Sequence, residues 1–519
     1  MEYRNPSSKQ GSRRLADYEP YKVDVLENTK SFVLAGIPVL VLLIIGLHYI
    51  KVEYWEDEVF SVITCRSLYG LFHMFHMTEN NMSLYSVILY FWMSMFGESE
   101  AATHALSLLF AVVAIIVFFQ LVRNWLNKTN SFFATLLLAV SPLFTYYSVE
   151  DRSYSLLILS VIVSTLLFIK LLKKPGYRIA IFYGLSIGIG TYIHYFALIL
   201  TGVHALMLTS KTLTKKYISL YILAALVGLI IISPLILFPP QSKTQVFWIV
   251  TPDLKDLWYV ISALFGGGYM VILLALCTIL ILINGYWKRG AGQSFFPEKI
   301  SIVWSFMPVL LIFAFSRIVT PIFEPLYFSW LTPGIALLIC LLVGYTSNNK
   351  IARSVIWICM LGVFTLKSIS LLNTKGAGFR ESAEYLNTNV KDGETVLVYP
   401  YFWYLDMNFY LDKIRTPNPA ARSIPMTSEP YQLGGGGLEP KPDFDFVQKM
   451  AKKGKVYFIC TGYGNDISKT DKKQNRIYLT AIKAILSKEL PAHQDFLFGE
   501  KSTSPVLIQV YDKQNQGKP

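Results

Sequence analysis

Charged residues are scarce in this chain. Only 16% of its 519 residues are Asp, Glu, Lys or Arg, whereas a soluble domain usually carries about 25%. A hydrophobic content of 53% and a mean hydropathy of +0.43 agree with this shortage. The apolar residues stand in long runs, and runs of about 18 or more such residues indicate membrane spans. The composition therefore excludes a single soluble domain and predicts a polytopic α-helical membrane protein.

Cysteine is scarce as well. The chain has 5 cysteines, and no two of them have the CxxC spacing of a metal site. We therefore expect neither a disulfide framework nor a metal cluster. No cofactor is expected to be required, and a divalent cation is left open. A cleavable signal peptide is also missing from the pattern, because the first apolar run follows the polar segment 1–30 and is too long for a signal core.

The apolar runs predict about eleven spans, most of them near the ~20 residues that a bilayer requires. They are 31–50, 101–121, 131–147, 154–172, 179–192, 196–210, 217–237, 269–287, 300–316, 328–346 and 354–373. The stretch 179–210 is too long for one crossing, and we divide it at the polar residue His194.

The distribution of basic residues predicts the orientation. The net charge is +13, and the basic residues of one set of loops outnumber those of the alternate loops by 20 to 6. The positive-inside rule assigns the richer set to the cytoplasm, so a nucleic-acid partner is not needed to explain the charge. The segment 1–30 is then cytoplasmic, 31–373 is the transmembrane domain, and 374–519 lies outside the cytoplasm.

Two regions outside the spans have their own predicted structure. In the outer loop 51–100, residues 59–77 and 84–96 mix aromatic and polar side chains and predict helices in the membrane interface. The tail 374–519 predicts a small α/β domain, with helices at 380–388 and 470–488 and strands at 395–399, 455–460 and 506–511. The glycines 434–437 lack the residues of a phosphate-binding loop and predict a flexible connection.

Ionisable residues gather at the predicted outer ends of the spans. They are Asp57, Glu58, Glu150, Asp151, Arg152, His194, Arg317 and Glu324. Each alone has an ordinary explanation: a solvated acid, an exposed ion pair worth under ~1 kcal/mol, or a histidine that bonds a neighbouring helix. Their joint placement on one face instead predicts one cavity, because ionisable groups near a membrane are expensive and commonly functional.

The residue types suggest a reaction. A carboxylate can take a proton from a hydroxyl group, and a cation can hold an anionic leaving group such as a phosphate. Nucleotide sugars are not available at the outer face. The pattern therefore predicts a substrate with a lipid-anchored phosphate.

Four motifs show a resemblance to a known superfamily. Asp57-Glu58 directly follows the first span, and Ser83-Leu84-Tyr85 runs to Phe96-Gly97-Glu98-Ser99-Glu100-Ala101. The other two are Ser141-Pro142-Leu143 through Tyr146-Tyr147-Ser148-Val149-Glu150-Asp151-Arg152-Ser153-Tyr154, and Tyr192-Ile193-His194-Tyr195-Phe196. In order and spacing the chain resembles the GT-C glycosyltransferases that use polyprenyl-phosphate sugars, such as protein O-mannosyltransferases, aminoarabinose transferases and Rgt-like transferases.

The resemblance implies an inverting transferase that moves one sugar from a polyprenyl-phosphate donor to a hydroxyl of a protein, glycan or glycolipid acceptor. It implies Asp57 as general base and Glu58 as its orienting partner. Donor contacts are implied for Arg152, Glu150, Tyr154, His194, Tyr195 and Arg317. The implied location is a bacterial inner membrane, with the C-terminal domain on the periplasmic or extracellular side.

Three positions depart from the superfamily pattern. Asn80–Ser83 stand where a basic residue and prolines are usual, His104 replaces an Arg, and Leu326-Tyr327 replaces Arg-Tyr. Arg152, Arg317, Lys243 and His194 are the candidates to replace the missing phosphate contacts. Two other functions stay open, a flippase for lipid-linked sugars and a transferase that moves an oligosaccharide as a block. No internal repeat of the kind common in transporters is seen.

Overall fold

The computed structural model describes twelve stretches of the chain. They are residues 25–77, 81–208, 212–239, 249, 251–272, 275–276, 296–346, 350–400, 403–426, 442–461, 469–502 and 505–513. Four predictions fall outside them: residues 1–24 of the cytoplasmic segment, most of the span 269–287, the candidate Lys243 and the glycine loop 434–437.

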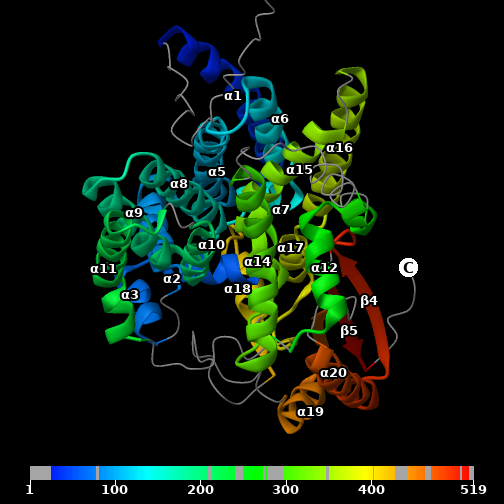
Figure 1. Cartoon of the computed structure of the whole chain (residues 1–519). Coiled ribbons are helices and arrows are strands. Elements are labelled where there is room, and N and C mark those ends of the chain that lie inside the picture. The colour runs from blue at the N-terminus through cyan, green and yellow to red at the C-terminus, as the bar shows by residue number, and fades with distance from the viewer. Residues whose placement is uncertain are drawn as a thin grey trace, which may run out of the picture.

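In the described residues up to 372, the regular structure is helical (Figure 1). Its elements up to the first bend are α1 (Val25–Tyr49), α2 (Glu56–Thr64), α3 (Leu68–Met77), α4 (Ser83–Phe96), α5 (Glu100–Val122), α6 (Lys128–Ala139) and α7 (Pro142–Ser148). They are followed by α8 (Tyr154–Lys173), α9 (Tyr177–Ile193), η2 (Tyr195–Leu198), α10 (Ile199–Leu206), α11 (Lys215–Leu237), α12 (Leu254–Leu264), α14 (Phe296–Ile318), η4 (Pro325–Leu331), α15 (Thr332–Thr346) and α16 (Lys350–Leu372).

Helices occur at each predicted span that lies within the described stretches. Six of them are long and apolar enough to cross a membrane, or seven if the bent pair α6 and α7 counts as one span. The count of about eleven spans therefore stays a prediction. The division at His194 is confirmed, because α9 ends at Ile193 and His194 has an extended backbone before η2.

The predicted span 131–147 differs from the structure. Helices α6 and α7 meet at an angle of 61°, so this segment is not one straight helix. Pro142 begins α7, where its missing N–H costs nothing, whereas inside a continuous helix it would remove a hydrogen bond and clash with the preceding turn. The bend directs the loop after Ser148 towards the first outer loop, where Glu58 accepts a hydrogen bond from Asp151 N.

The first outer loop holds three helices, α2, α3 and α4, where two were predicted. The predicted helix 59–77 is divided at residues 65–67, and its first part begins earlier, at Glu56. Three acidic residues fill the first turn of α2, and negative charge there is favourable because the backbone N–H groups of a helix N-terminus are unpaired. The acidic residues of the Asp57-Glu58 motif therefore also favour the start of helix α2.

The C-terminal part forms a mixed sheet of five strands with helices on both faces. Its elements are α17 (Phe379–Asn389), β1 (Thr395–Val398), α18 (Trp403–Asp412), η5 (Pro419–Ala421), β2 (Ile424–Pro425), α19 (Phe444–Lys453), β3 (Val456–Thr461), α20 (Lys469–Glu489), β4 (Ala492–Phe498) and β5 (Val506–Asp512). The strand order is β2-β1-β3-β5-β4, with β1 parallel to β2 and β3, and β5 antiparallel to β3 and β4. The predicted small α/β domain is confirmed in this form.

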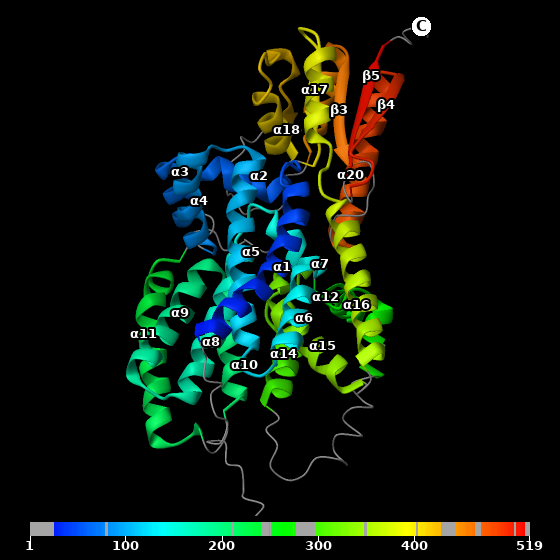
Figure 2. The same cartoon turned by 90° about the horizontal axis from the view of Figure 1, so that it is seen from above.

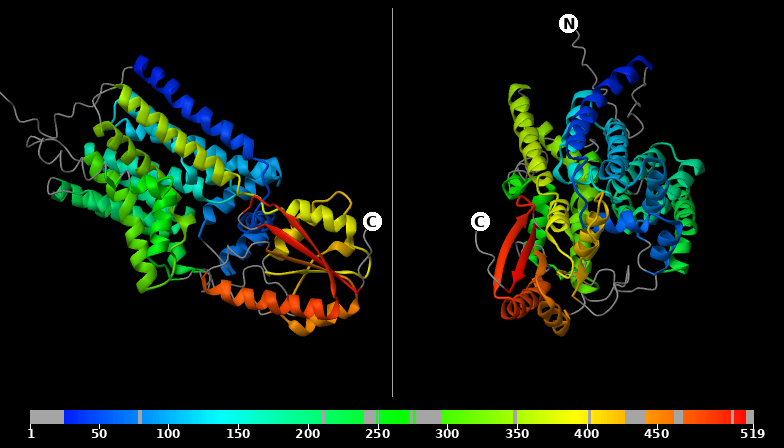
Figure 3. Two further views of the ribbon diagram at one scale, coloured as in Figure 1. Left: turned by 90° about the vertical axis from the view of Figure 1, so that its right-hand side faces the viewer. Right: turned by 180° about the vertical axis from the view of Figure 1, so that it is seen from behind.

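The two faces of the sheet belong to different cores. Side chains alternate along a strand, so Leu397 packs with α19 and α20 whereas Val396 and Val398 face the other side. On that side, α17 and α18 join a core that continues into the membrane helices. Figures 2 and 3 show the C-terminal elements at one end of the helical bundle, with α18 beside α2.

Candidate functional site

Glu58 ties three segments together at the outer end of the bundle. Its side chain is 1% exposed, its Oε2 accepts a hydrogen bond from Trp55 N (3.2 Å), and its Oε1 accepts from Asp151 N (2.6 Å). His104 Nε2 on α5 lies 2.8 Å from the same Oε1. Burial alone would raise the pKa of Glu58, but His104 and Lys375 hold it below its ordinary value. Glu58 therefore fixes the position of α2 as a buried carboxylate.

Asp57 points to a more open environment than Glu58 does. Its side chain is 40% exposed, and its Oδ2 lies 3.4 Å from Nη2 of Arg152. Arg152 Nη1 also donates to the backbone O of Asp57 (3.4 Å) and to Ser61 Oγ (3.2 Å). The structure thus brings the predicted base and the predicted phosphate ligand into direct contact. Asp57 lies in the first turn of α2, and Arg152 lies in the loop before α8.

Glu150 pairs with a lysine that no sequence motif predicts. Its Oε2 lies 3.0 Å from Nζ of Lys375, and both side chains are buried. Lys375 Nζ also donates to Val149 O (3.3 Å) and lies 3.9 Å from the ring centre of Tyr146. Burial raises the pKa of Glu150 to about 7, against the opposing effect of Lys375. Lys375 belongs to the connection between α16 and α17, so the C-terminal linker reaches the site.

Asp151 belongs to the same loop as Glu150, between α7 and α8. Its Oδ1 accepts a hydrogen bond from the Tyr85 hydroxyl (2.8 Å), and Tyr85 also lies 3.1 Å from Ser107 Oγ. Burial, followed by the negative charge of Glu58, raises the pKa of Asp151 to about 7. The carboxyl is fully buried. It therefore links α4 and the loop inside the protein and is out of reach of a substrate.

His194 and Tyr154 form an aromatic group next to Arg152. Their ring centres are 6.1 Å apart, and Tyr327 lies 5.6 Å from His194. The backbone N–H of Phe196 donates to His194 Nδ1 (3.2 Å). Burial and the charge of Arg152 lower the pKa of His194 to about 3. The imidazole is therefore neutral at physiological pH and supplies no positive charge for a phosphate.

Two further predicted residues lie at the edge of this arrangement. The backbone N–H of Tyr195 donates to Asn81 Oδ1 (3.1 Å), and its side chain is 37% exposed. Arg317 at the end of α14 donates to Pro252 O (2.8 Å) and to no residue of the cluster. The structure therefore brings Asp57, Glu58, Glu150, Arg152, Tyr154 and His194 together, and it places Arg317 apart.

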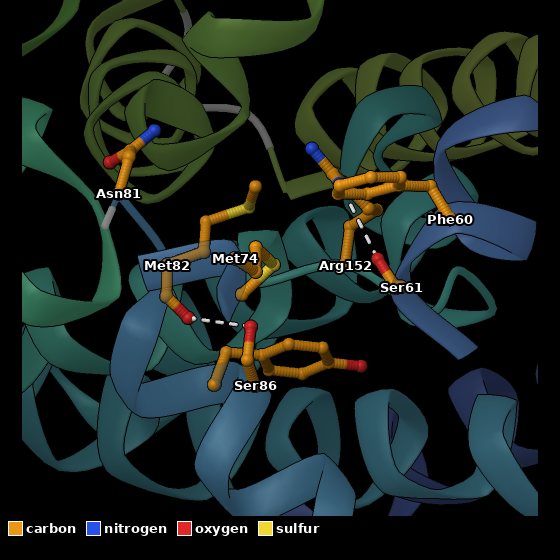
Figure 4. A pocket seen from close by; sticks show the side chains of 8 residues that line it. Phe60, Ser61, Met74, Asn81, Met82, Ser86 and Arg152 are labelled. Carbon is orange, nitrogen blue, oxygen red and sulfur yellow. Dashed lines mark hydrogen bonds between the residues drawn. The ribbon is translucent and has the colours of Figure 1, made fainter. Parts of the chain in front are cut away.

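A small pocket opens beside Arg152. It lies between α2, α3 and α4 and is lined by Phe60, Ser61, Met74, Asn81, Met82, Tyr85, Ser86 and Arg152. Figure 4 shows Arg152 at Ser61, with methionine side chains on the opposite side. Its cavity volume is about 10 Å³, which is room for about one water molecule. Its lining combines the guanidinium of Arg152 with apolar side chains. In the part of the chain that the structure describes, no three His, Cys, Asp or Glu residues are placed to hold a metal ion.

His104, Tyr85 and Lys375 are the members of the site that sequence reasoning did not assign. His104 was noted only as a departure from the superfamily pattern, yet it pairs with Glu58. Tyr85 belongs to the motif that begins Ser83-Leu84-Tyr85, so the motif could have indicated it. Lys375 has no local pattern, since its partner Glu150 is 225 residues away.

One known protein family matches part of this chain. Residues 83–238 match the family of dolichyl-phosphate-mannose-protein mannosyltransferases. This segment includes Glu150, Arg152, Tyr154 and His194 and ends before the C-terminal domain. A comparison with curated protein sequences gives no match.

The fold is similar to that of solved structures. ArnT from Cupriavidus metallidurans in the apo state is 13% identical, with a TM-score of 0.57 over 95% of this chain and 100% of that one. Its structure bound to undecaprenyl phosphate is also 13% identical, with a TM-score of 0.55 over 93% and 99%. The Archaeoglobus fulgidus oligosaccharyltransferase tethered to an acceptor peptide is 10% identical, with a TM-score of 0.50 over 95% and 75%.

These proteins are GT-C glycosyltransferases, which confirms the resemblance inferred from the four motifs. The identities are low, so the structural matches speak for the fold. The chain is a multi-pass membrane protein with the GT-C glycosyltransferase fold, and its residues 83–238 are similar to the dolichyl-phosphate-mannose-protein mannosyltransferase family.

Proposed function

We propose that this protein transfers a single hexose or pentose from a polyprenyl-phosphate donor to a hydroxyl of a protein, glycan or glycolipid. The observation that carries the proposal is the contact of Asp57 with Arg152 at the edge of the pocket. One side chain can accept a proton and the other can hold a phosphate. The match of residues 83–238 to a family named for a lipid-phosphate sugar supports the donor class.

The proposed reaction is a single displacement. Asp57 takes the proton from the acceptor hydroxyl as its oxygen bonds to the anomeric carbon. The bond from that carbon to the phosphate oxygen breaks, and polyprenyl phosphate leaves with the electron pair. Attack from the side opposite the leaving group inverts the configuration. Because the phosphate is a stable anion, the reaction needs charge stabilisation from Arg152 more than it needs a general acid.

The other site residues have supporting roles in this proposal. Glu58 holds the first turn of α2 and so orients Asp57, and Glu150 engages Lys375. Tyr154, the neutral His194 and Tyr195 form the aromatic side of the donor site. Arg317 receives no step, because it is bound to Pro252.

The proposed location is a bacterial inner membrane, with the N-terminus in the cytoplasm and the site on the outer side. The excess of basic residues in one set of loops supports this orientation. Helix α3 exposes Tyr69 and Phe72, which suits the predicted place of the first outer loop in the membrane interface. A polyprenyl tail would then enter from the bilayer.

The test is a lipid analysis of a strain that lacks the gene. The expected result is accumulation of a polyprenyl-phosphate sugar, reversed by the wild-type gene and not by Asp57→Asn. Mass spectrometry of the product separates the addition of one sugar from that of a block. An unchanged lipid profile, together with an unchanged set of glycosylated products, would contradict the proposal.

A further inference from the structure

Both ring nitrogens of His104 face oxygen atoms that accept hydrogen bonds. Nδ1 lies 3.0 Å from the backbone O of Ile50, directly after α1, and Nε2 lies 2.8 Å from Oε1 of Glu58. The side chain is 0% exposed, and the ring of Tyr54 packs edge-on against it, with ring centres 5.4 Å apart. Water therefore does not compete for either contact.

These two contacts decide how many protons the pair of His104 and Glu58 holds. A neutral imidazole has one N–H group and one lone pair, whereas a charged imidazole donates from both nitrogens. Either neutral form would place a lone pair against an oxygen, of the backbone or of the carboxylate. A protonated Glu58 could supply the missing hydrogen, but it accepts hydrogen bonds from two backbone N–H groups, which favour its charged form. The geometry therefore favours a doubly protonated ring beside a carboxylate.

Glu58 stands between the base and the cation of the proposed site. It follows Asp57 in the chain, so a shift of its backbone also moves Asp57. Its Oε1 accepts a hydrogen bond from the backbone N–H of Asp151 (2.6 Å), which precedes Arg152. The contact of 3.4 Å between Asp57 Oδ2 and Arg152 Nη2 thus joins the two residues next to this hydrogen bond. Because His104 binds the same Oε1 from α5, it fixes the hydrogen bond that sets the base opposite the cation.

A second buried histidine has different partners. His204 on α10 is 1% exposed. Its Nδ1 lies 2.8 Å from the hydroxyl of Tyr183, and its Nε2 lies 3.2 Å from Thr165 Oγ1. A hydroxyl can donate or accept a hydrogen bond, so a neutral imidazole satisfies both contacts. Unlike His104, His204 needs no second proton where it is.

Other groups around the pair also titrate. Those that act on His104 or Glu58 come from five elements: Tyr54 before α2, Tyr85 on α4, Glu150 and Asp151 in the loop before α8, Lys375 in the linker before α17, and Asp406 on α18. The pH profile of one protein alone would mix their charges with that of His104. A comparison of two residues at position 104, of which one titrates and the other does not, leaves all of them in place.

We propose that His104 is a positioning residue of the active site, whose doubly protonated ring holds Glu58 and so keeps Asp57 in place. The inference rests on the proposed function, and His104 acts on the base through Glu58. The superfamily pattern has an arginine at this position, and an arginine keeps its charge at every pH. Histidine changes its charge near neutral pH, so in this protein the hold on Asp57 weakens as pH rises.

The first test replaces each buried histidine by phenylalanine in the purified full-length protein. His104→Phe keeps a ring and removes both N–H donors. Because misplacement of a reacting group by about 1 Å can cost about 100-fold, we expect this variant to lower kcat about 100-fold at unchanged donor KM. His204→Phe is the matched control and should change neither constant. In a protein that already carries Glu58→Gln, His104→Phe should cause no further loss, because His104 acts through Glu58.

The second test is a pH profile of His104→Gln. The glutamine amide donates to Glu58 and does not titrate. A neutral donor holds a carboxylate less strongly than a charged one, so we expect kcat within about 10-fold of the wild type at about pH 7. Between about pH 7 and about pH 10, the ratio of the wild-type kcat to that of the variant should fall about 10-fold. The wild-type melting temperature should fall relative to the variant over the same range, because loss of the ring proton leaves Glu58 facing a lone pair.

Three outcomes would overturn the inference: wild-type kcat in His104→Phe, equal losses in His104→Phe and His204→Phe, or parallel pH profiles of the wild type and His104→Gln. If His104→Phe does not accumulate, the pH profiles decide alone. A wild-type protein that shows the expected change of melting temperature with pH and transfers no sugar would contradict the proposed function and not the pairing of His104 with Glu58.

Discussion

The two sides of the site hold their buried carboxyls differently. On the side of the membrane helices, Glu58 lies beside His104 and Glu150 lies beside Lys375. On the side of the C-terminal domain, Asp406 has neither a cation nor a hydrogen-bond donor among the described residues. In the first arrangement a basic side chain lies beside each acid, whereas Asp406 is buried without such a partner among the described residues.

The basic side chains of the site fall into two groups according to the acids that they contact. His104 and Lys375 pair with buried acids, whereas Arg152 contacts the half-exposed Asp57 and lines the pocket. A buried ion pair contributes little net stability, but removing one partner is costly because the other charge stays buried. The helical side should therefore tolerate the joint removal of a pair and not the removal of one member.

The largest effect is expected for Asp57→Asn. Asparagine keeps the shape of the side chain but cannot accept the proton, and general base catalysis contributes about 10²–10⁴-fold. We expect the transfer rate to fall by that factor, with donor affinity and folding unchanged. Glu56→Gln is the control on the same helical turn. A rate within a few fold of the wild type would assign the base to another residue.

The next effect is on stability. Lys375→Met leaves Glu150 buried without its cation, so we expect a loss of about 3–5 kcal/mol in the free energy of unfolding. The double variant Glu150→Gln with Lys375→Met should recover most of this loss. Unfolding of the purified protein in increasing SDS gives both values. Additive losses would show that Glu150 and Lys375 are not energetically coupled, contrary to this prediction.

A smaller effect is expected for Arg152→Ala. A hydrogen bond to a charged group contributes about 1.5–3 kcal/mol, so the affinity for polyprenyl phosphate should fall about 10–100-fold. Arg66→Ala is the control, because Arg66 forms an exposed pair with Glu98 at 2.7 Å, and such pairs contribute under ~1 kcal/mol. Equal affinities of the two variants in a binding assay would remove Arg152 from the donor site.

The smallest effect is a pH dependence of stability at Asp151. Its pKa is raised to about 7 by burial, against about 3.9 in an unfolded chain. Between these values the unfolded chain has lost the proton that the folded protein keeps, so stability falls as pH rises from about 4 to about 7. Relative to the wild type, Asp151→Asn should therefore gain melting temperature between pH 5 and pH 8. If the melting temperatures of Asp151→Asn and the wild type differ by the same amount at pH 5 and at pH 8, the raised pKa of Asp151 is contradicted.

The sequence predicts the elements better than their contacts. Long apolar runs and local motifs located the membrane helices, α4, and the strands β1, β3 and β5, because each of these signals lies within one segment. Helix α18 was missed because it is buried over most of its circumference, with the consecutive residues 406–411 all inside, and so shows no amphipathic pattern. Strand β4 was missed because it is largely exposed at the sheet edge.

The same reason limits what the sequence reveals of the site. Asp57, Glu58, Glu150 and Arg152 stand in motifs and were predicted to lie together. Lys375 and Asp406 come from the linker and the C-terminal domain. Their relation to the motifs depends on how that domain packs against α2, which no local pattern encodes.

The most direct test of the account is a transfer assay with the purified wild-type protein. The donor is a polyprenyl-phosphate sugar, and membranes of the deletion strain supply the unmodified acceptor. We expect release of free polyprenyl phosphate and a product of inverted anomeric configuration. An intact donor in the presence of folded protein, or a product of retained configuration, would contradict it.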